Sequence, residues 1–190
     1  MTQFDYIVVL VSVIVGLGVV HLLAGVARFL TRRDEWKPYW VHLLWTWNVF
    51  NYLVFFWWFV YRWKTVPKWS LMLFLFVLLY SVGIYLLCAV LYPEKEDRRT
   101  FREIYFENKG VFFGLWIVLI VFDFIDTHLK EHYGLSGFGM FQIVNYLVIV
   151  VGSAIAARST SHRVHAIWAI LFFVIISAFE YVNFRVLRAN

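Results

Sequence analysis

The stretch that decides the fold is FDYIVVLVSVIVGLGVVHLLAGVARFL, residues 4–30. It has one acidic residue near its start, one basic residue near its end, and apolar or small residues almost throughout. About 20 such residues are enough to cross the hydrocarbon core of a bilayer as a helix. The stretch therefore predicts a transmembrane helix.

The composition of the whole chain extends this prediction. Of its 190 residues, 63% are hydrophobic and 22% are aromatic, and the mean hydropathy is +0.74. A soluble domain of this size could not bury so much apolar surface. We predict an all-α, polytopic membrane protein with a single transmembrane domain over residues 1–190. Its six transmembrane helices are expected at roughly 4–30, 39–62, 69–92, 110–129, 139–158 and 163–186.

The basic residues predict the orientation of these spans. Eleven of the 17 Lys and Arg residues fall on one side of them, which the positive-inside rule places in the cytoplasm, with both termini outside. The first ten residues have no basic segment and no cleavage site, so we expect the first span to be retained. Cys88 is the only cysteine, which excludes an intrachain disulfide.

The loop PEKEDRRTFREIYFENKG, residues 93–110, has features of a helix start. Thr100 and Glu103 have the spacing of a capping box. We expect a short interfacial helix near 100–108 on the cytoplasmic leaflet, with the basic residues of 95–109 facing anionic lipid head groups. The alternative is a solvated hairpin between two spans.

A short repeat raises the possibility of internal symmetry. The sequence NYLV occurs at 51–54 and again at 145–148. This offset would superpose the first three spans on the last three, which gives a possible 3+3 inverted repeat of the kind that many transporters use.

Two motifs carry a resemblance to a known group of proteins. GLGVVHLLAGVAR at 16–28 and YWVHLLW at 39–45 resemble the first and second spans of uncharacterised bacterial six-span membrane proteins with the patterns GLGxxHLLxGxxR and YWxHLLW. The resemblance covers about the first sixty residues. It implies a bacterial inner membrane and no particular activity.

Polar residues inside the spans are the candidate functional groups, because a charged side chain at the bilayer centre costs about 3 kcal/mol or more. Asp123 and Asp126 share a helical stripe with Lys130, and Glu180 shares another with Asn183. Both stripes are expected in the outer third of the membrane. Deeper polar groups that could continue a path inward are Asn48, Asn51 and Asn145.

Two interpretations of these groups stay open at this point. In the first, the acids line a water-filled vestibule that attracts cations or relays protons. In the second, Asp123 or Glu180 pairs with Lys130, Arg62 or Arg185 and only fixes the packing of the helices.

Three histidines are expected near the cytoplasmic side: His21, His42 and His165. Neutral imidazoles on three helices could bind a transition metal, and two of them could ligate haem. The sequence favours no metal site, however, because no span contains paired ligands at metal-binding spacing. Each histidine would then bond a neighbouring carbonyl or hydroxyl.

The first span also has small residues on two faces: Ser12, Gly16, Gly18 and Gly25. Small residues allow close helix packing in a membrane, where lipid provides no hydrophobic driving force. One face is expected to pack inside the protomer and the other against a second helix or subunit, which suggests a homo-oligomer.

These features favour a small channel or transporter for protons or small cations, with His21 near the cytoplasmic exit. One alternative is a haem- or metal-binding redox protein that uses the three histidines. Another is a scaffold or accessory subunit that transports nothing. No phosphate loop, GxSxG or HExxH motif is present, so we expect neither an enzyme nor a resident cofactor, and the net charge of +5 indicates topology and lipid contact rather than nucleic-acid binding.

Overall fold

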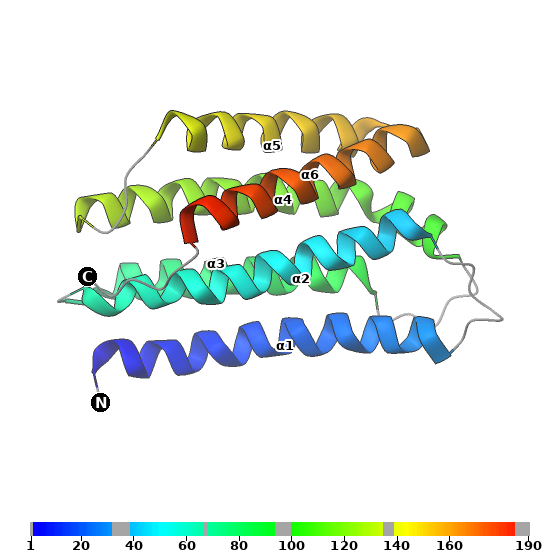
Figure 1. Ribbon diagram of the computed structural model, residues 1–190. Coiled ribbons are helices and arrows are strands. Elements are labelled where there is room, and N and C mark those ends of the chain that lie inside the picture. Colours follow the sequence, from blue (N-terminus) through cyan, green and yellow to red (C-terminus); the bar gives the residue numbers. More distant parts are fainter. Residues whose placement is uncertain (1, 32–38, 67, 94–99, 135–138, 185–190) are drawn as a thin grey trace.

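The computed structural model describes residues 2–31, 39–66, 68–93, 100–134 and 139–184, of which the side chains of residues 180 and 182–184 are left out. The described residues form six long α-helices and one short 3-10 helix (Figure 1). The elements are α1 (Gln3–Thr31), α2 (Trp40–Val60), η1 (Tyr61–Thr65), α3 (Leu71–Leu91), α4 (Phe101–His132), α5 (Met140–Arg158) and α6 (His162–Phe184).

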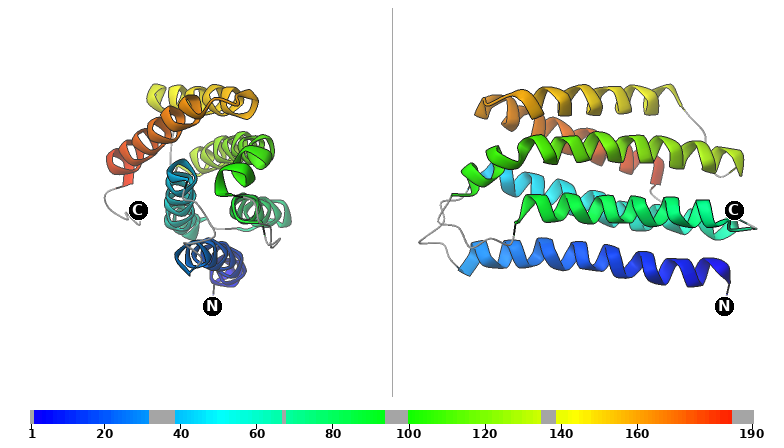
Figure 2. Two further views of the ribbon diagram at one scale, coloured as in Figure 1. Left: turned by 90° about the vertical axis from the view of Figure 1, so that its right-hand side faces the viewer. Right: turned by 180° about the vertical axis from the view of Figure 1, so that it is seen from behind.

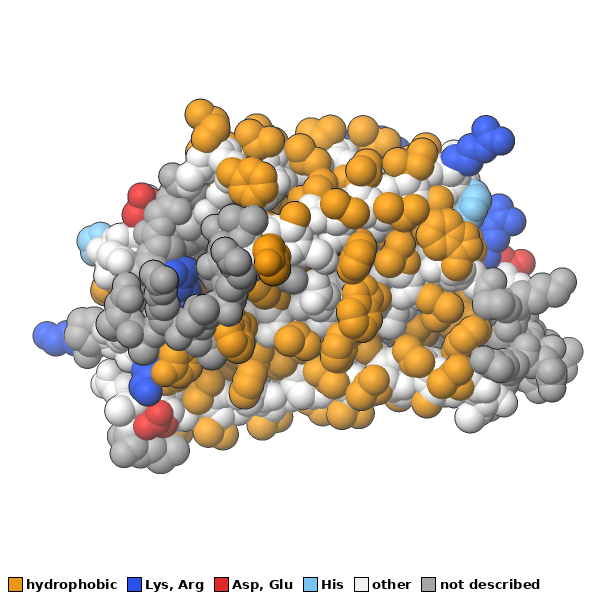
Figure 3. All heavy atoms as spheres, in the orientation of Figure 1, with side chains coloured by type: hydrophobic (Ala, Val, Ile, Leu, Met, Phe, Trp, Pro, Cys, Tyr) orange, Lys and Arg blue, Asp and Glu red, His pale blue; other side chains and the backbone are white. Residues whose placement is uncertain are grey.

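All six α-helices are long and apolar enough to cross a membrane, which confirms the predicted all-α, six-span architecture. Large apolar side chains remain exposed along the helices, among them Leu17, Leu79 and Leu147. They cover the middle of the bundle, whereas charged side chains gather at its two ends (Figure 3). This distribution matches a bilayer between two aqueous phases. We call the end at which α1 begins and α6 ends the outer end and the opposite end the inner end, following the expected orientation.

The helices pack in a closed ring that does not follow their order in the chain. Successive neighbours are α1, α3, α4, α5, α6, α2 and again α1, and the view along the bundle shows this arrangement (Figure 2). Helix α2 also contacts α3 and α4, so its buried residues, such as Trp45 and Val49, form the centre of the core.

This arrangement does not support the inverted repeat. Helix α1 packs along α3, but the equivalent pair under a 3+3 repeat, α4 and α6, forms no comparable interface. The two occurrences of NYLV therefore lie in different surroundings. Asn145 lines a cavity that is described below, and Asn51 is not among the residues that line it.

The segment after residue 99 also differs from the expected interfacial helix. The capping box is confirmed: the Thr100 hydroxyl accepts a bond from the Glu103 amide, and the Glu103 carboxylate accepts one from the Thr100 amide. The helix that begins there continues without a break into the fourth span. Because Phe101 and Tyr105 are buried in the bundle, these first turns pack against other helices and do not form a separate helix on the leaflet.

Candidate functional site

A cavity of about 50 Å³ lies in the outer half of the bundle, between α2, α3, α4, α5 and α6. This volume is room for a few water molecules, since one needs roughly 10–15 Å³. The polar residues that line it are Asp123, Asp126, Lys130, Gln142 and Asn145. Its eight aromatic lining residues are Tyr52, Phe55, Phe56, Phe59, Trp63, Tyr80, Tyr146 and Phe179.

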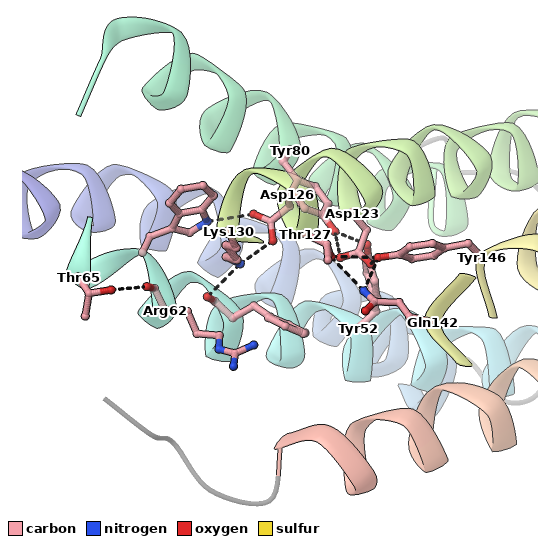
Figure 4. A network of polar contacts seen from close by, with 12 residues as sticks. Tyr52, Arg62, Thr65, Tyr80, Asp123, Asp126, Thr127, Lys130, Gln142 and Tyr146 are labelled. Atoms are coloured by element: carbon pink, nitrogen blue, oxygen red, sulfur yellow. Dashed lines mark hydrogen bonds and ion pairs between the residues drawn. The ribbon is translucent and has the colours of Figure 1, made fainter. Parts of the chain in front are cut away.

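Asp123 is the polar group on which the surrounding tyrosines converge. Its Oδ1 accepts a hydrogen bond of 3.1 Å from the Tyr80 hydroxyl, and its Oδ2 accepts one of 2.8 Å from the Tyr146 hydroxyl (Figure 4). Both oxygens of this carboxyl group therefore act as hydrogen-bond acceptors. Among the described side chains, no Lys, Arg or His forms an ion pair with Asp123.

The hydrogen bonds behind these two tyrosines have a fixed direction. The hydroxyls of Tyr52 and Tyr80 are 2.7 Å apart. A phenol has one hydrogen, and that of Tyr80 is used on Asp123, so Tyr52 must donate to Tyr80. On the other side, Gln142 Nε2 donates to the Tyr146 hydroxyl at 2.7 Å. Two hydrogen-bonded chains therefore end at one carboxylate.

Thr127 completes the second chain. Its hydroxyl lies 3.1 Å from that of Tyr146 and accepts a bond of 3.0 Å from Gln142 Nε2. Both amide hydrogens of Gln142 are thus used, one on Thr127 and one on Tyr146. This set of bonds holds the Tyr146 hydroxyl toward Asp123.

Asp126 has a different environment, although it lies less than one turn away on the same helix. Its Oδ2 is 2.5 Å from the Nζ of Lys130, and its Oδ1 accepts a bond of 2.9 Å from the indole of Trp63. The Lys130 ammonium also donates to the Phe59 carbonyl at 3.4 Å. The 3-10 turn η1 supplies Trp63, which is 1% exposed. Asp126 is therefore a neutralised, structural carboxylate.

Among the described side chains, Asn145 is the one further residue of the predicted pathway that lines this cavity. Asn48 donates to the Ala169 carbonyl at 3.1 Å, so it ties α2 to α6. Asn145 does line the cavity, and its Nδ2 is buried without a hydrogen-bond partner. Glu180 and Asn183 belong to α6, but their side chains lie outside the described residues.

The histidines each bond a backbone carbonyl through Nε2. His21 contacts the Tyr92 carbonyl at 2.8 Å, and His42 contacts the adjacent Leu91 carbonyl at 2.9 Å. His165 contacts the Ser159 carbonyl at 3.0 Å through Nε2 and the Tyr105 hydroxyl at 2.8 Å through Nδ1. In the part of the chain that the structure describes, no three His, Cys, Asp or Glu side chains form a group that could hold a metal.

The small residues of α1 fall into two sets. Gly18 packs on Leu53 and Cys88, and a Cβ on Gly25 would lie 2.4–2.6 Å from ring carbons of Tyr92. These two glycines thus allow α1 to approach α3. Ser12 accepts a bond of 3.1 Å from the indole of Trp57, and Gly16 faces open space.

Sequence reasoning missed the tyrosines of the site. Tyr52, Tyr80 and Tyr146 lie inside apolar spans, where an aromatic ring is expected for packing alone. The available signal was the i, i+4 spacing of Gln142 and Tyr146 beside Asn145, which places an amide and a hydroxyl on one face of a short span. Nothing in the sequence pairs these residues with Asp123.

Comparison with known proteins finds no matching family model, no matching curated protein and no matching solved structure. The site is therefore interpreted from its own geometry.

Proposed function

We propose that this protein is a small transporter for protons or small cations in a bacterial inner membrane, and that Asp123 is its central binding group. One observation carries the proposal: Asp123 is a carboxylate at membrane depth that lines a cavity and has no ion-pair partner among the described side chains. A charge in that position is costly unless a partner or a bound ion compensates it.

The neighbouring carboxylate serves as an internal comparison. Asp126 shows what a carboxylate looks like when it only stabilises packing, since Lys130 neutralises it and Trp63 donates to it. Asp123 lines the same cavity but forms no ion pair with a described cation. The difference supports a binding role for Asp123 over the alternative of structural pairing.

The packing of the inner half favours a carrier over an open channel. Between the cavity and the inner end, buried aromatic rings fill the bundle. The ring centroid of Trp45 lies 5.0–5.3 Å from those of Phe112, Phe113 and Phe172. The ring centroid of Trp116 lies 4.6 Å from that of Phe172. A bound ion would need these helices to rearrange before it reached the inner side. Such alternating access is common in transporters.

Two further parts of the proposal concern partners. The open face at Gly16 offers α1 a position for a second copy of the chain. At the inner end, Arg102 is exposed beside Phe106, and we propose that it contacts anionic lipid head groups. Lys109 of this patch donates to the Ser159 carbonyl, and the basic residues within 95–99 lie outside the described residues.

The test is ion flux into proteoliposomes that contain the purified protein. The wild type should carry protons, Na⁺ or K⁺ down an imposed gradient faster than empty vesicles, and Asp123→Asn should reduce this flux to the empty-vesicle rate. Glu131→Gln is the matched control, because Glu131 is an exposed acid at the outer end of the same helix. Equal flux for wild type and Asp123→Asn, or no flux above empty vesicles, would overturn the proposal.

A further inference from the structure

The cavity wall already contains one ammonium group, that of Lys130. Its Nζ lies 5.0 Å from the ring centroid of Phe59 and 5.3 Å from that of Trp63. The same atom is 2.5 Å from a carboxylate oxygen of Asp126. Aromatic faces combined with a carboxylate are the surroundings that a desolvated ammonium ion prefers, because the ring quadrupole attracts the cation without requiring oxygen ligands.

Asp123 presents the same chemistry without a tethered cation. Tyr80 and Tyr146 are aromatic residues of the same cavity lining, and their hydroxyls bond its two oxygens. A carboxylate has about four acceptor positions, so two remain for N–H donors of a ligand. The amide of Asn145 is a further polar group on the wall, and its Nδ2 has no partner.

The balance of oxygen atoms and rings distinguishes an ammonium ion from an alkali metal ion. A metal ion that leaves water needs its hydration shell replaced by a set of oxygen ligands. Here the hydroxyls of Tyr80 and Tyr146 already donate to Asp123, and eight aromatic side chains make up much of the lining. One carboxylate and the surrounding aromatic rings are enough to stabilise an ammonium ion.

We propose that the cavity beside Asp123 binds a small ammonium ion, either ammonium itself or a primary ammonium with a short alkyl group. The volume of about 50 Å³ corresponds to roughly three or four water-sized atoms, which sets the upper limit on the ligand. This inference rests on the proposed function and names the class of cation that the same site takes.

The test measures cation binding to the full chain in lipid nanodiscs by titration calorimetry, with methylammonium, Na⁺ and K⁺ chlorides compared at one ionic strength. Methylammonium should bind about tenfold more tightly than Na⁺ or K⁺. Tetraethylammonium, which exceeds the cavity, should not bind. Asp123→Asn should abolish methylammonium binding, whereas Glu131→Gln should leave it unchanged.

Two variants at position 146 distinguish the contribution of the aromatic ring to binding from that of the hydroxyl. Tyr146→Phe and Tyr146→Leu both lose the hydroxyl bond to Asp123, but only the phenylalanine variant keeps the ring. Tyr146→Leu should bind methylammonium about tenfold more weakly than Tyr146→Phe, while the affinity for K⁺ should be equal in the two variants. Circular dichroism and gel filtration establish that both variants fold.

The outcomes distinguish this inference from the proposed function. Flux or binding of Na⁺, K⁺ or protons that depends on Asp123, without preference for methylammonium or with equal affinities in the two Tyr146 variants, overturns the ammonium site and leaves the cation transporter standing. Absence of any Asp123-dependent binding or flux overturns both.

Discussion

His21 on α1 and His42 on α2 bond the carbonyls of consecutive residues at the end of α3. The acceptors are Tyr92 and Leu91, at 2.8 and 2.9 Å. The last carbonyls of a helix have no amide partner within the helix, so an outside donor stabilises them. In each case the imidazole donates its Nε2 hydrogen, and the two histidines tie three helices together at the inner end.

Tyr92 is the point at which the two sequence motifs meet. Its ring packs on Gly25 of the first motif, and its hydroxyl lies 2.9 Å from that of Thr46, just after the second motif. Burial raises the pKa of the Tyr92 hydroxyl above its ordinary value, which keeps it protonated and able to donate. The two motifs thus meet around the end of α3.

The contact between Gly25 and Tyr92 predicts the effect of a single methyl group. Gly25→Ala should lower the free energy of unfolding by about 1–3 kcal/mol, because the new Cβ would overlap ring carbons that a buried side chain cannot easily move. Denaturant unfolding in detergent micelles measures the change. Gly16→Ala is the control, with nothing within 4 Å of its Cβ, and it should keep or slightly raise stability. Equal losses in both variants would contradict this account.

The bond from His42 to Leu91 predicts a structural cost that is independent of metal. His42 is 1% exposed, so His42→Leu leaves a buried carbonyl without a donor and should cost about 1–3 kcal/mol of stability. His42→Gln, which can still donate, should recover part of this loss. Thermal unfolding with and without a chelator checks it. A wild-type unfolding temperature that rises with Zn²⁺, with no such rise in His42→Leu, would show that the histidine binds metal instead.

The buried ion pair predicts a large effect from removing one partner. Lys130→Met leaves Asp126 buried and unpaired, which should reduce the free energy of unfolding by about 3–5 kcal/mol. The double variant Asp126→Leu, Lys130→Met should recover most of that loss, because it removes both charges. The same denaturant titration measures both variants. A double variant as unstable as the single one would mean that the pair is not the source of the loss.

The two tyrosines of the first chain predict graded effects on flux. Tyr80→Phe removes a hydroxyl that stabilises the free carboxylate of Asp123, so a cation should bind more tightly and the concentration for half-maximal flux should fall about three- to tenfold. Tyr52→Phe removes a hydroxyl that bonds Tyr80 and not Asp123 itself, so it should change the concentration for half-maximal flux less. Concentration series in proteoliposomes measure this value. This role of the Tyr80 hydroxyl would be excluded if the concentration for half-maximal flux rose in Tyr80→Phe, or if Tyr52→Phe had the larger effect.

The local sequence was sufficient to predict where the spans lie, but not how they pack against one another. Hydropathy and helix length depend on residues that are close in the chain, so five of the six helices lie within a few residues of the predicted ranges. The exception is α4, which begins at Phe101 rather than near residue 110. There the capping box was visible in sequence, but burial of Phe101 and Tyr105 against other helices was not.

The sequence by itself determined that this chain has six helices long and apolar enough to cross a membrane, and that Asp123 and Asp126 share one stripe of the fourth. Only the tertiary structure decided that the i, i+4 pair of Asp126 and Lys130 is buried, with the indole of Trp63 donating to Asp126. It also decided that Tyr80 and Tyr146, which lie 43 and 23 residues from Asp123, both donate to that carboxylate. The physical reason is that hydrogen bonds and ion pairs form between groups that packing brings within about 3 Å, and the ring order of the helices is not encoded in any local pattern.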